Sequence, residues 1–200
     1  EYGAAPLDLH LTSDLCAFLA GMKFSDLSPD AVHQARRGTL DWIGCALAGS
    51  PSETITKLLS VLEAVGGRKQ ATVLARNLKL GLLEAPIANG QMGHLLDYDD
   101  THMGGVILHT SSPVLAALFA LADARPVDGK GFIASYAAGF EAGVRVGKTA
   151  PSHHDGGWHL TGPPGTIPAG LASAHPPGPN AGPTPSPAGI PATQAAGLPP

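Results

Sequence analysis

The sequence predicts an all-α protein, and three observations support this fold class. Several segments of the 200-residue chain repeat apolar residues with a period near 3.6, as the buried face of a helix requires. The strict alternation of apolar and polar residues that is typical of half-buried strands is missing from most of the chain. Finally, the expected helices are rich in Ala and Gly, whose small side chains allow neighbouring helices to approach closely.

The first three expected helices have clear boundaries. Residues 12–20 place apolar side chains at helical spacing after a Thr-Ser start. Ser28 and Pro29 suit the N-cap and first position of a long second helix that runs to about residue 48, where Gly49-Ser50-Pro51 ends it. Residues 53–65 form a third helical pattern that stops at Gly66-Gly67.

The middle of the chain predicts one strand and three more helices. Residues 71–75 are the one plausible strand. A helix is expected from Pro86 to the following aspartates, with Gly90 and Gly93 allowing another helix to lie against it. Further helical patterns cover residues 113–124 and 132–147, the second of them preceded by Asp128-Gly129 and stopped by Pro151.

The last forty residues differ in composition. Residues 161–200 contain 12 of the 19 prolines and no charged side chain, which is typical of irregular, low-complexity chain. One proline inside a helix costs about 3 kcal/mol or more, so several prolines predict that regular helices do not form here. We therefore expect a helical domain over 1–160 and an irregular continuation over 161–200.

Composition and charge exclude several classes of protein. With 12 basic and 16 acidic residues the net charge is -4, and no basic run is present that would neutralise a line of phosphates. Nucleic acid is therefore not an expected partner. No apolar run approaches the roughly 18 residues of a membrane span, and the start of the chain does not resemble a signal peptide. We expect a cytoplasmic protein in which Cys16 and Cys45 are small buried side chains rather than a disulfide.

The most informative segment is HLLDYDDTHMGGVILHTSSP, residues 94–113, which concentrates three aspartates and three histidines between two expected helices. A calcium loop of the EF-hand type does not fit, because its sixth position is His102 where Gly is needed and its twelfth is Leu108 where Glu is needed. A metal-dependent phosphohydrolase built on His154-Asp155, with His94 or His109 and Asp100, lacks the late aspartate that such a site requires.

One further motif matches a known pattern only superficially. Residues 142–149, AGVRVGKT, fit a permissive phosphate-loop pattern. A true phosphate loop follows a strand and opens a helix at its Lys-Thr pair, whereas here a helical pattern precedes the motif and Pro151 follows it. Nucleophile elbows, dinucleotide fingerprints and Cys-x-x-Cys pairs are absent from the sequence.

Several blocks in order resemble the MmgE/PrpD family, whose members include 2-methylcitrate dehydratase, cis-aconitate decarboxylase and iminodisuccinate epimerase. The blocks run from about Thr12 to Leu198 and comprise ANGQMGHLLDYDDTH, LHTSSPVLAALFALAD, YAAGFEAGVRVG, APSHHDGGWHLTGPPGT and ATQAAGL. The resemblance implies a helical domain followed by an α+β lid domain, with this chain covering only the first part of the helical domain. It also implies a homodimer without a redox cofactor or metal.

The chemistry of the resemblance is the handling of a proton next to a carboxylate of a small di- or tricarboxylate. Such a step needs a group that titrates near neutrality, for which His is suited, and donors that hold the carboxylates. By resemblance, Asp97, Thr101, His109 and His159 occupy active-site positions. We expect His109 or His159 to transfer the proton, Asp97 to orient an imidazole or a substrate hydroxyl, and Thr101 to bind a carboxylate.

The remaining polar residues of the cluster receive a structural interpretation. Asp99 and Asp100 are expected to cap or bridge neighbouring helices. Three activities stay open for the parent protein, which is a dehydratase, a decarboxylase or an epimerase. Because the lysines and the tyrosine of the family's site would come from later in the chain, we expect the 200-residue chain alone to be inactive; a non-catalytic helical module that dimerises is the alternative.

Overall fold

The computed structural model describes residues 11–149 and 162–174, and within them the protein is mostly helical with one small hairpin. The predicted all-α class is therefore confirmed. The elements are, in order, α1 (Leu11–Gly21), the short 3-10 helix η1 (Phe24–Asp26), α2 (Pro29–Gly49), α3 (Glu53–Val65), β1 (Ala71–Val73), β2 (Leu78–Leu80), α4 (Glu84–His94), α5 (Ser111–Ala124), α6 (Gly129–Lys148) and α7 (Gly162–Ala174).

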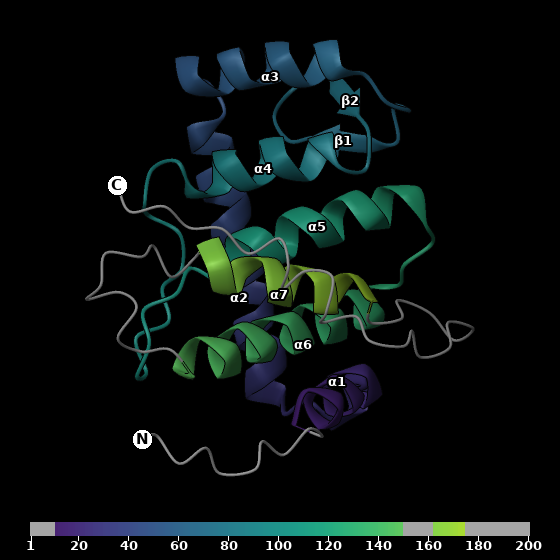
Figure 1. The fold of residues 1–200 in the computed structure, drawn as a ribbon, viewed down its shortest axis with the longest axis vertical. Helices are drawn as coiled ribbons and strands as arrows, with labels where there is room; N and C mark the ends of the chain where they lie inside the picture. The colour runs from purple at the N-terminus through teal and green to yellow at the C-terminus, as the bar shows by residue number, and fades with distance from the viewer. Residues whose placement is uncertain (1–10, 150–161, 175–200) are drawn as a thin grey trace, which may run out of the picture.

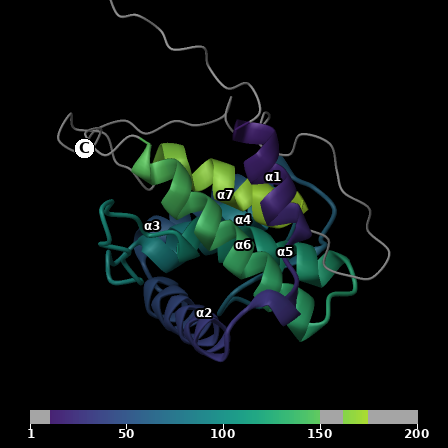
Figure 2. The same cartoon turned by 90° about the horizontal axis from the view of Figure 1, so that it is seen from below.

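The helices lie in successive layers (Figure 1). In that view α3 and the small hairpin lie above α4, which is followed downward by α5, α7, α6 and α1. Helix α4 packs against α2 and α5, while α7 packs against α5 and α6. Figure 2 shows α1 beside α6 and α7, with α2 on the other side of α6. Helices α2, α4 and α5 thus pack together, and the polar segment that joins α4 to α5 leaves and re-enters this group of helices.

The predicted starts and packing of the helices are largely confirmed. The Ser28 hydroxyl accepts a hydrogen bond from the Ala31 amide at 3.1 Å, which makes it the N-cap of α2. Gly93 lies so close to α2 that an added Cβ would sit 2.0 Å from Nε1 of Trp42. The fully buried Trp42 in turn donates a hydrogen bond of 3.2 Å to the Ser112 hydroxyl on α5. Glycine at position 93 therefore allows α4, α2 and α5 to meet at one indole.

The predicted strand forms β1, whereas the sequence pattern does not predict its partner, β2. Strand β1 pairs antiparallel with β2, with Ala71 opposite Leu80 and Val73 opposite Leu78. Three residues, LKL, are too short to give a detectable alternation. The buried Asn89 on α4 completes the hairpin edge, since its amide accepts from the Leu74 N–H and donates to the Thr72 carbonyl, each at 2.9 Å.

The expectation of irregular chain beyond residue 160 is wrong for residues 162–174, which form α7. Two of the prolines in this stretch fall in the first turn of the helix, where backbone N–H groups have no helical partner to lose. Pro168 is inside the helix and is fully buried. It lies against α6, because an added Cβ on Gly143 would be 3.3 Å from its Cγ. Tertiary packing therefore offsets the cost of the interior proline. Residues 175–200 lie outside the described residues, as does His159.

No helix of the described residues is both long and apolar enough to cross a bilayer.

Candidate active site

The segment that joins α4 to α5 carries the polar cluster. Helix α4 ends at His94, and the chain then turns so that Asp97 adopts φ 50°, in the left-handed region that few non-glycine residues occupy. The Asp97 N–H donates to the His94 carbonyl at 3.0 Å, which closes the turn. An antiparallel bridge between His102 and Leu108 then pins the loop. These features bring residues 94 to 109 back onto one another.

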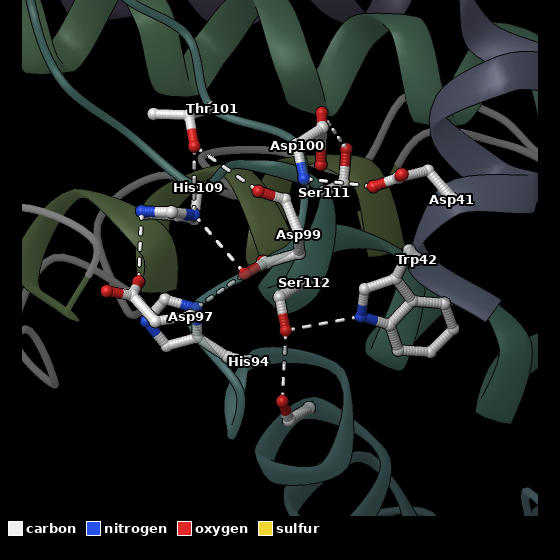
Figure 3. A network of polar contacts seen from close by, with 11 residues as sticks. Asp41, Trp42, His94, Asp97, Asp99, Asp100, Thr101, His109, Ser111 and Ser112 are labelled. Carbon is white, nitrogen blue, oxygen red and sulfur yellow. Dashed lines mark hydrogen bonds and ion pairs between the residues drawn. The ribbon is translucent and has the colours of Figure 1, made fainter. Parts of the chain in front are cut away.

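The centre of the cluster is Asp99, whose side chain is 0% exposed (Figure 3). Its Oδ1 atom lies 2.9 Å from Nδ1 of His94 and 3.3 Å from Nδ1 of His109. The two imidazole rings lie 4.7 Å apart between centroids and are tilted by 58°. One buried carboxylate therefore contacts two imidazoles through a single oxygen.

Two further side chains surround His109. Its Nε2 lies 3.5 Å from Oδ1 of Asp97, and its Nδ1 lies 3.4 Å from the Thr101 hydroxyl. That hydroxyl also donates to the Asp99 carbonyl at 3.2 Å. Asp97 differs from Asp99 in environment, because its side chain is 78% exposed. The Nε2 side of His109 therefore faces the exposed Asp97 side chain, although the ring itself is only 13% exposed.

Burial and charge shift the pKa of His94. The hydrogen bond from Nδ1 to Asp99 raises the pKa of His94 above its ordinary value, because the carboxylate stabilises the imidazolium. Burial acts in the opposite direction and is the smaller effect. His94 therefore keeps its proton to a higher pH than a solvated histidine.

A second polar network starts at Asp100, the residue that follows Asp99. The Asp100 amide donates to Oδ2 of Asp41 at 3.0 Å, and the Ser111 hydroxyl donates to Oδ2 of Asp100 at 2.7 Å. Ser111 also contacts the hydroxyl of Tyr136, whose pKa burial raises. Burial likewise raises the pKa of Asp100, with a smaller opposing contribution from the Ser111 hydrogen bond. These contacts join the loop to α2 and α5, so the structural interpretation of Asp100 remains a prediction that they favour.

A pocket of about 760 Å³ lies between α1, α2 and α6 on the far side of this second network. Asp41, Asp100 and Tyr136 line it together with apolar side chains such as Phe18 and Phe140. The residues around His109 do not line this pocket. The cluster and the pocket are therefore separate features.

The sequence-based site is reproduced in part. The structure brings Asp97, Thr101 and His109 together, and His159 lies outside the described residues. Of the two structural roles expected for Asp99, capping or bridging helices, its contact with His94 at the end of α4 fits the bridging one, and it reaches His109 as well. His94 also belongs to the cluster, and the sequence pattern does not predict this. The His-x4-Asp spacing at the end of a helix was the one available signal for this pair.

Two hypotheses, one of a metal site and one of a phosphate loop, can be compared with this geometry. His94, Asp99 and His109 each offer one ligand atom, and these atoms lie within 4.8 Å of one another. Two imidazoles and a carboxylate suit several divalent transition metals, so the expectation of a metal-free site remains a prediction. The phosphate-loop pattern at 142–149 falls almost entirely inside α6, which confirms its rejection.

Comparisons with known proteins agree with the resemblance. The model of the MmgE/PrpD N-terminal domain matches residues 13–199. The chain is 34% identical over 201 residues to the cis-aconitate decarboxylase-like protein oryM of Aspergillus oryzae, covering 94% of this chain and 41% of that relative. It is 27% identical over 156 residues to the cis-aconitate decarboxylase of Aspergillus terreus, covering 74% of this chain and 32% of the relative. The human cis-aconitate decarboxylase is 26% identical over 137 residues, which are 68% of this chain and 28% of that protein. The chain thus spans less than half the length of each of these relatives, and it belongs to the MmgE/PrpD family, whose N-terminal domain it carries.

Proposed function

We propose that the full-length protein is a carbon–carbon lyase that decarboxylates cis-aconitate or a closely similar small tricarboxylate. The observation that carries the proposal is the placement of Asp97 and Thr101 at the two nitrogens of the His109 imidazole. Relatives named as cis-aconitate decarboxylases favour decarboxylation over the dehydration and epimerisation that the family resemblance leaves open.

The reaction sets clear demands on these residues. When CO2 leaves the CH2–carboxylate arm of cis-aconitate, the electrons of the broken C–C bond move the double bond by one position. The former vinyl carbon then takes up one proton, which gives methylenesuccinate. An imidazole that titrates near neutrality is suited to deliver that proton. His109 is in the position to do so through Nε2, and His159 is the other candidate from the sequence.

The neighbouring residues supply orientation in this proposal. Asp97, 3.5 Å from Nε2 of His109, would orient the imidazolium or a substrate hydroxyl. The Thr101 hydroxyl would bind a substrate carboxylate. Because carboxylates repel Asp97, further cationic groups are needed for the tricarboxylate, and the relatives' greater length leaves room for them. The expected homodimer remains part of the proposal and is checked by analytical ultracentrifugation.

The direct experiment incubates the full-length protein with cis-aconitate and follows CO2 release and methylenesuccinate by proton NMR. His109→Gln should lower kcat by about 100-fold or more if His109 transfers the proton. Parallel incubations with 2-methylcitrate and with iminodisuccinate test the dehydratase and epimerase activities. Turnover of either of these in place of cis-aconitate would contradict the proposed decarboxylase.

A further inference from the structure

Among the side chains of the cluster, Asp99 is the most deeply buried and makes the shortest contacts with the imidazoles. Its side chain is 0% exposed, whereas that of Asp97 is 78% exposed. Oδ1 of Asp99 reaches Nδ1 of both His94 and His109, at 2.9 and 3.3 Å. Oδ2 has no hydrogen-bond partner within the parts of the chain that the structure describes, so both contacts depend on Oδ1. A buried carboxylate held in this way costs free energy, which points to a role in the site.

The contacts around His109 determine which ring nitrogen carries the proton in the neutral ring. A carboxylate only accepts hydrogen bonds, so the Nδ1 that faces Asp99 must carry hydrogen. The Thr101 hydroxyl leads to the same result, since it gives its proton to the Asp99 carbonyl at 3.2 Å and offers a lone pair to Nδ1 at 3.4 Å. Two acceptors face Nδ1, whereas Nε2 faces only the more distant and exposed Asp97 carboxylate, so the contacts favour a neutral ring with its proton on Nδ1 and its lone pair on Nε2.

We infer that Asp99 is a positioning residue, which fixes the orientation and the Nδ1–H tautomer of His109 so that Nε2 exchanges the proton with substrate, and which holds His94 beside it as a second imidazole. This inference rests on the proposed function for the role of His109 in proton transfer. A buried carboxylate behind an imidazole performs the same task in Ser-His-Asp enzymes, where its conversion to the amide leaves the fold intact but lowers kcat by about 10⁴-fold through the wrong tautomer.

Asp97 is a weaker candidate for this role. It contacts His109 at Nε2 across 3.5 Å, on the side that substrate has to reach, and it is solvated. Contacts between exposed charges contribute little orientation because solvent and side-chain freedom compete with them. Of the two roles expected for Asp97, orienting an imidazole or a substrate hydroxyl, the inference leaves it the second, since Asp99 holds the Nδ1 side of His109 and Asp97 borders the Nε2 side.

The first test is kinetic and compares Asp99→Asn with Asp100→Asn in the full-length protein. The amide at position 99 can accept from one Nδ1–H only, and its NH2 group opposes the other. We expect kcat on cis-aconitate to fall by about 100-fold or more, with KM changed by less than about threefold. Asp100→Asn is the matched control, since its carboxyl contacts Ser111 rather than either imidazole, and it should retain kcat. An Asp99→Asn variant that retains kcat within about threefold of wild type would overturn the inference.

The second test needs no substrate and no variant. Nitrogen-15 NMR of the histidine rings in the wild-type full-length protein, at a pH where the rings are neutral, reports the tautomer of His94 and His109. We expect Nδ1–H in both. An Nε2–H tautomer at His109 would overturn the inference, even where Asp99→Asn does not fold.

Failure of the proposed function is distinguishable from failure of this inference. If no polycarboxylate is turned over but the rings show Nδ1–H in wild type and lose it in Asp99→Asn, the positioning role stands and the decarboxylase proposal falls. If the wild type decarboxylates cis-aconitate and His109 carries its proton on Nε2, the decarboxylase proposal stands and the positioning inference falls. Stoichiometric binding of added Zn²⁺ that removes both Nδ1–H signals and supports turnover would also overturn the inference, because the three side chains would then be metal ligands.

Discussion

Asp99 and Asp100 are neighbours in sequence, yet they lie in two regions with opposite electrostatic character. Asp99 faces two imidazoles, and its charge raises the pKa of His94. Asp100 faces a serine hydroxyl and lies near Asp41, and burial raises its own pKa. The partner, as well as burial, therefore decides which group has its pKa raised. The contact with Asp99 raises the pKa of the His94 imidazole, whereas burial beside a hydroxyl and another acid raises the pKa of the Asp100 carboxyl itself.

The largest expected effect on stability comes from removing the hydroxyl that supports the Asp100 region. Ser111 is fully buried and contacts both Asp100 and Tyr136. Ser111→Ala leaves a carboxyl oxygen and a phenol without that partner, and we expect a loss of about 3 kcal/mol. Urea unfolding of the variant and wild type measures the difference. Ser173→Ala on α7 is a matched control, since Ser173 bonds only its own helix at Ala169 and should cost less than about 1 kcal/mol. Equal losses in the two variants would contradict the comparison.

The Asp99 region should show a pH dependence of the same direction as that of Asp100, since the pKa values of His94 and of Asp100 are both raised in the fold. The pKa of folded His94 lies above its unfolded value, so its pair with Asp99 stabilises the fold fully below the unfolded pKa and loses this contribution as pH rises through the folded pKa. His94→Gln should therefore be destabilised by about 2 kcal/mol in mild acid and by less in alkaline solution. Thermal unfolding at several pH values measures this trend, and a pH-independent difference from wild type would refute it.

The smallest expected effect is a gain of stability. Because the pKa of Asp100 is raised in the fold, ionisation of this carboxyl opposes folding above its folded pKa and not below its unfolded value. Asp100→Asn removes the ionisation while its amide oxygen still accepts from Ser111. We expect the variant to be more stable than wild type by about 1 kcal/mol at neutral pH, with the difference vanishing in strong acid. Glu63→Gln, on the exposed side of α3, provides a control for the loss of one negative charge. A destabilised Asp100→Asn at neutral pH would show that the carboxylate form is the native one.

The sequence predicts only those parts of the site that lie in one short segment or that match the family's motifs. Asp97, Thr101 and His109 lie within one short segment and match the family's positions, and the structure places them together. The contact of Asp99 with both imidazoles was not predicted, because an alternating Asp-x-Asp pattern does not show which carboxylate is buried. The loop also contains a left-handed residue, Asp97, which sequence patterns do not reveal.

The sequence by itself determined the helical class, most helix boundaries and the position of the polar cluster. These features depend on local chemistry, namely the 3.6-residue repeat and caps such as Ser28 and Asp128, each of which accepts from the amide three residues later. Only the tertiary structure decided the outcome for α7 and for Asp99. Buried contacts with α6 offset the helix-breaking cost of Pro168, and the return of the loop between α4 and α5 places one carboxylate between two imidazoles. Both results depend on contacts between residues that are not neighbours in the sequence. Such contacts override local propensity.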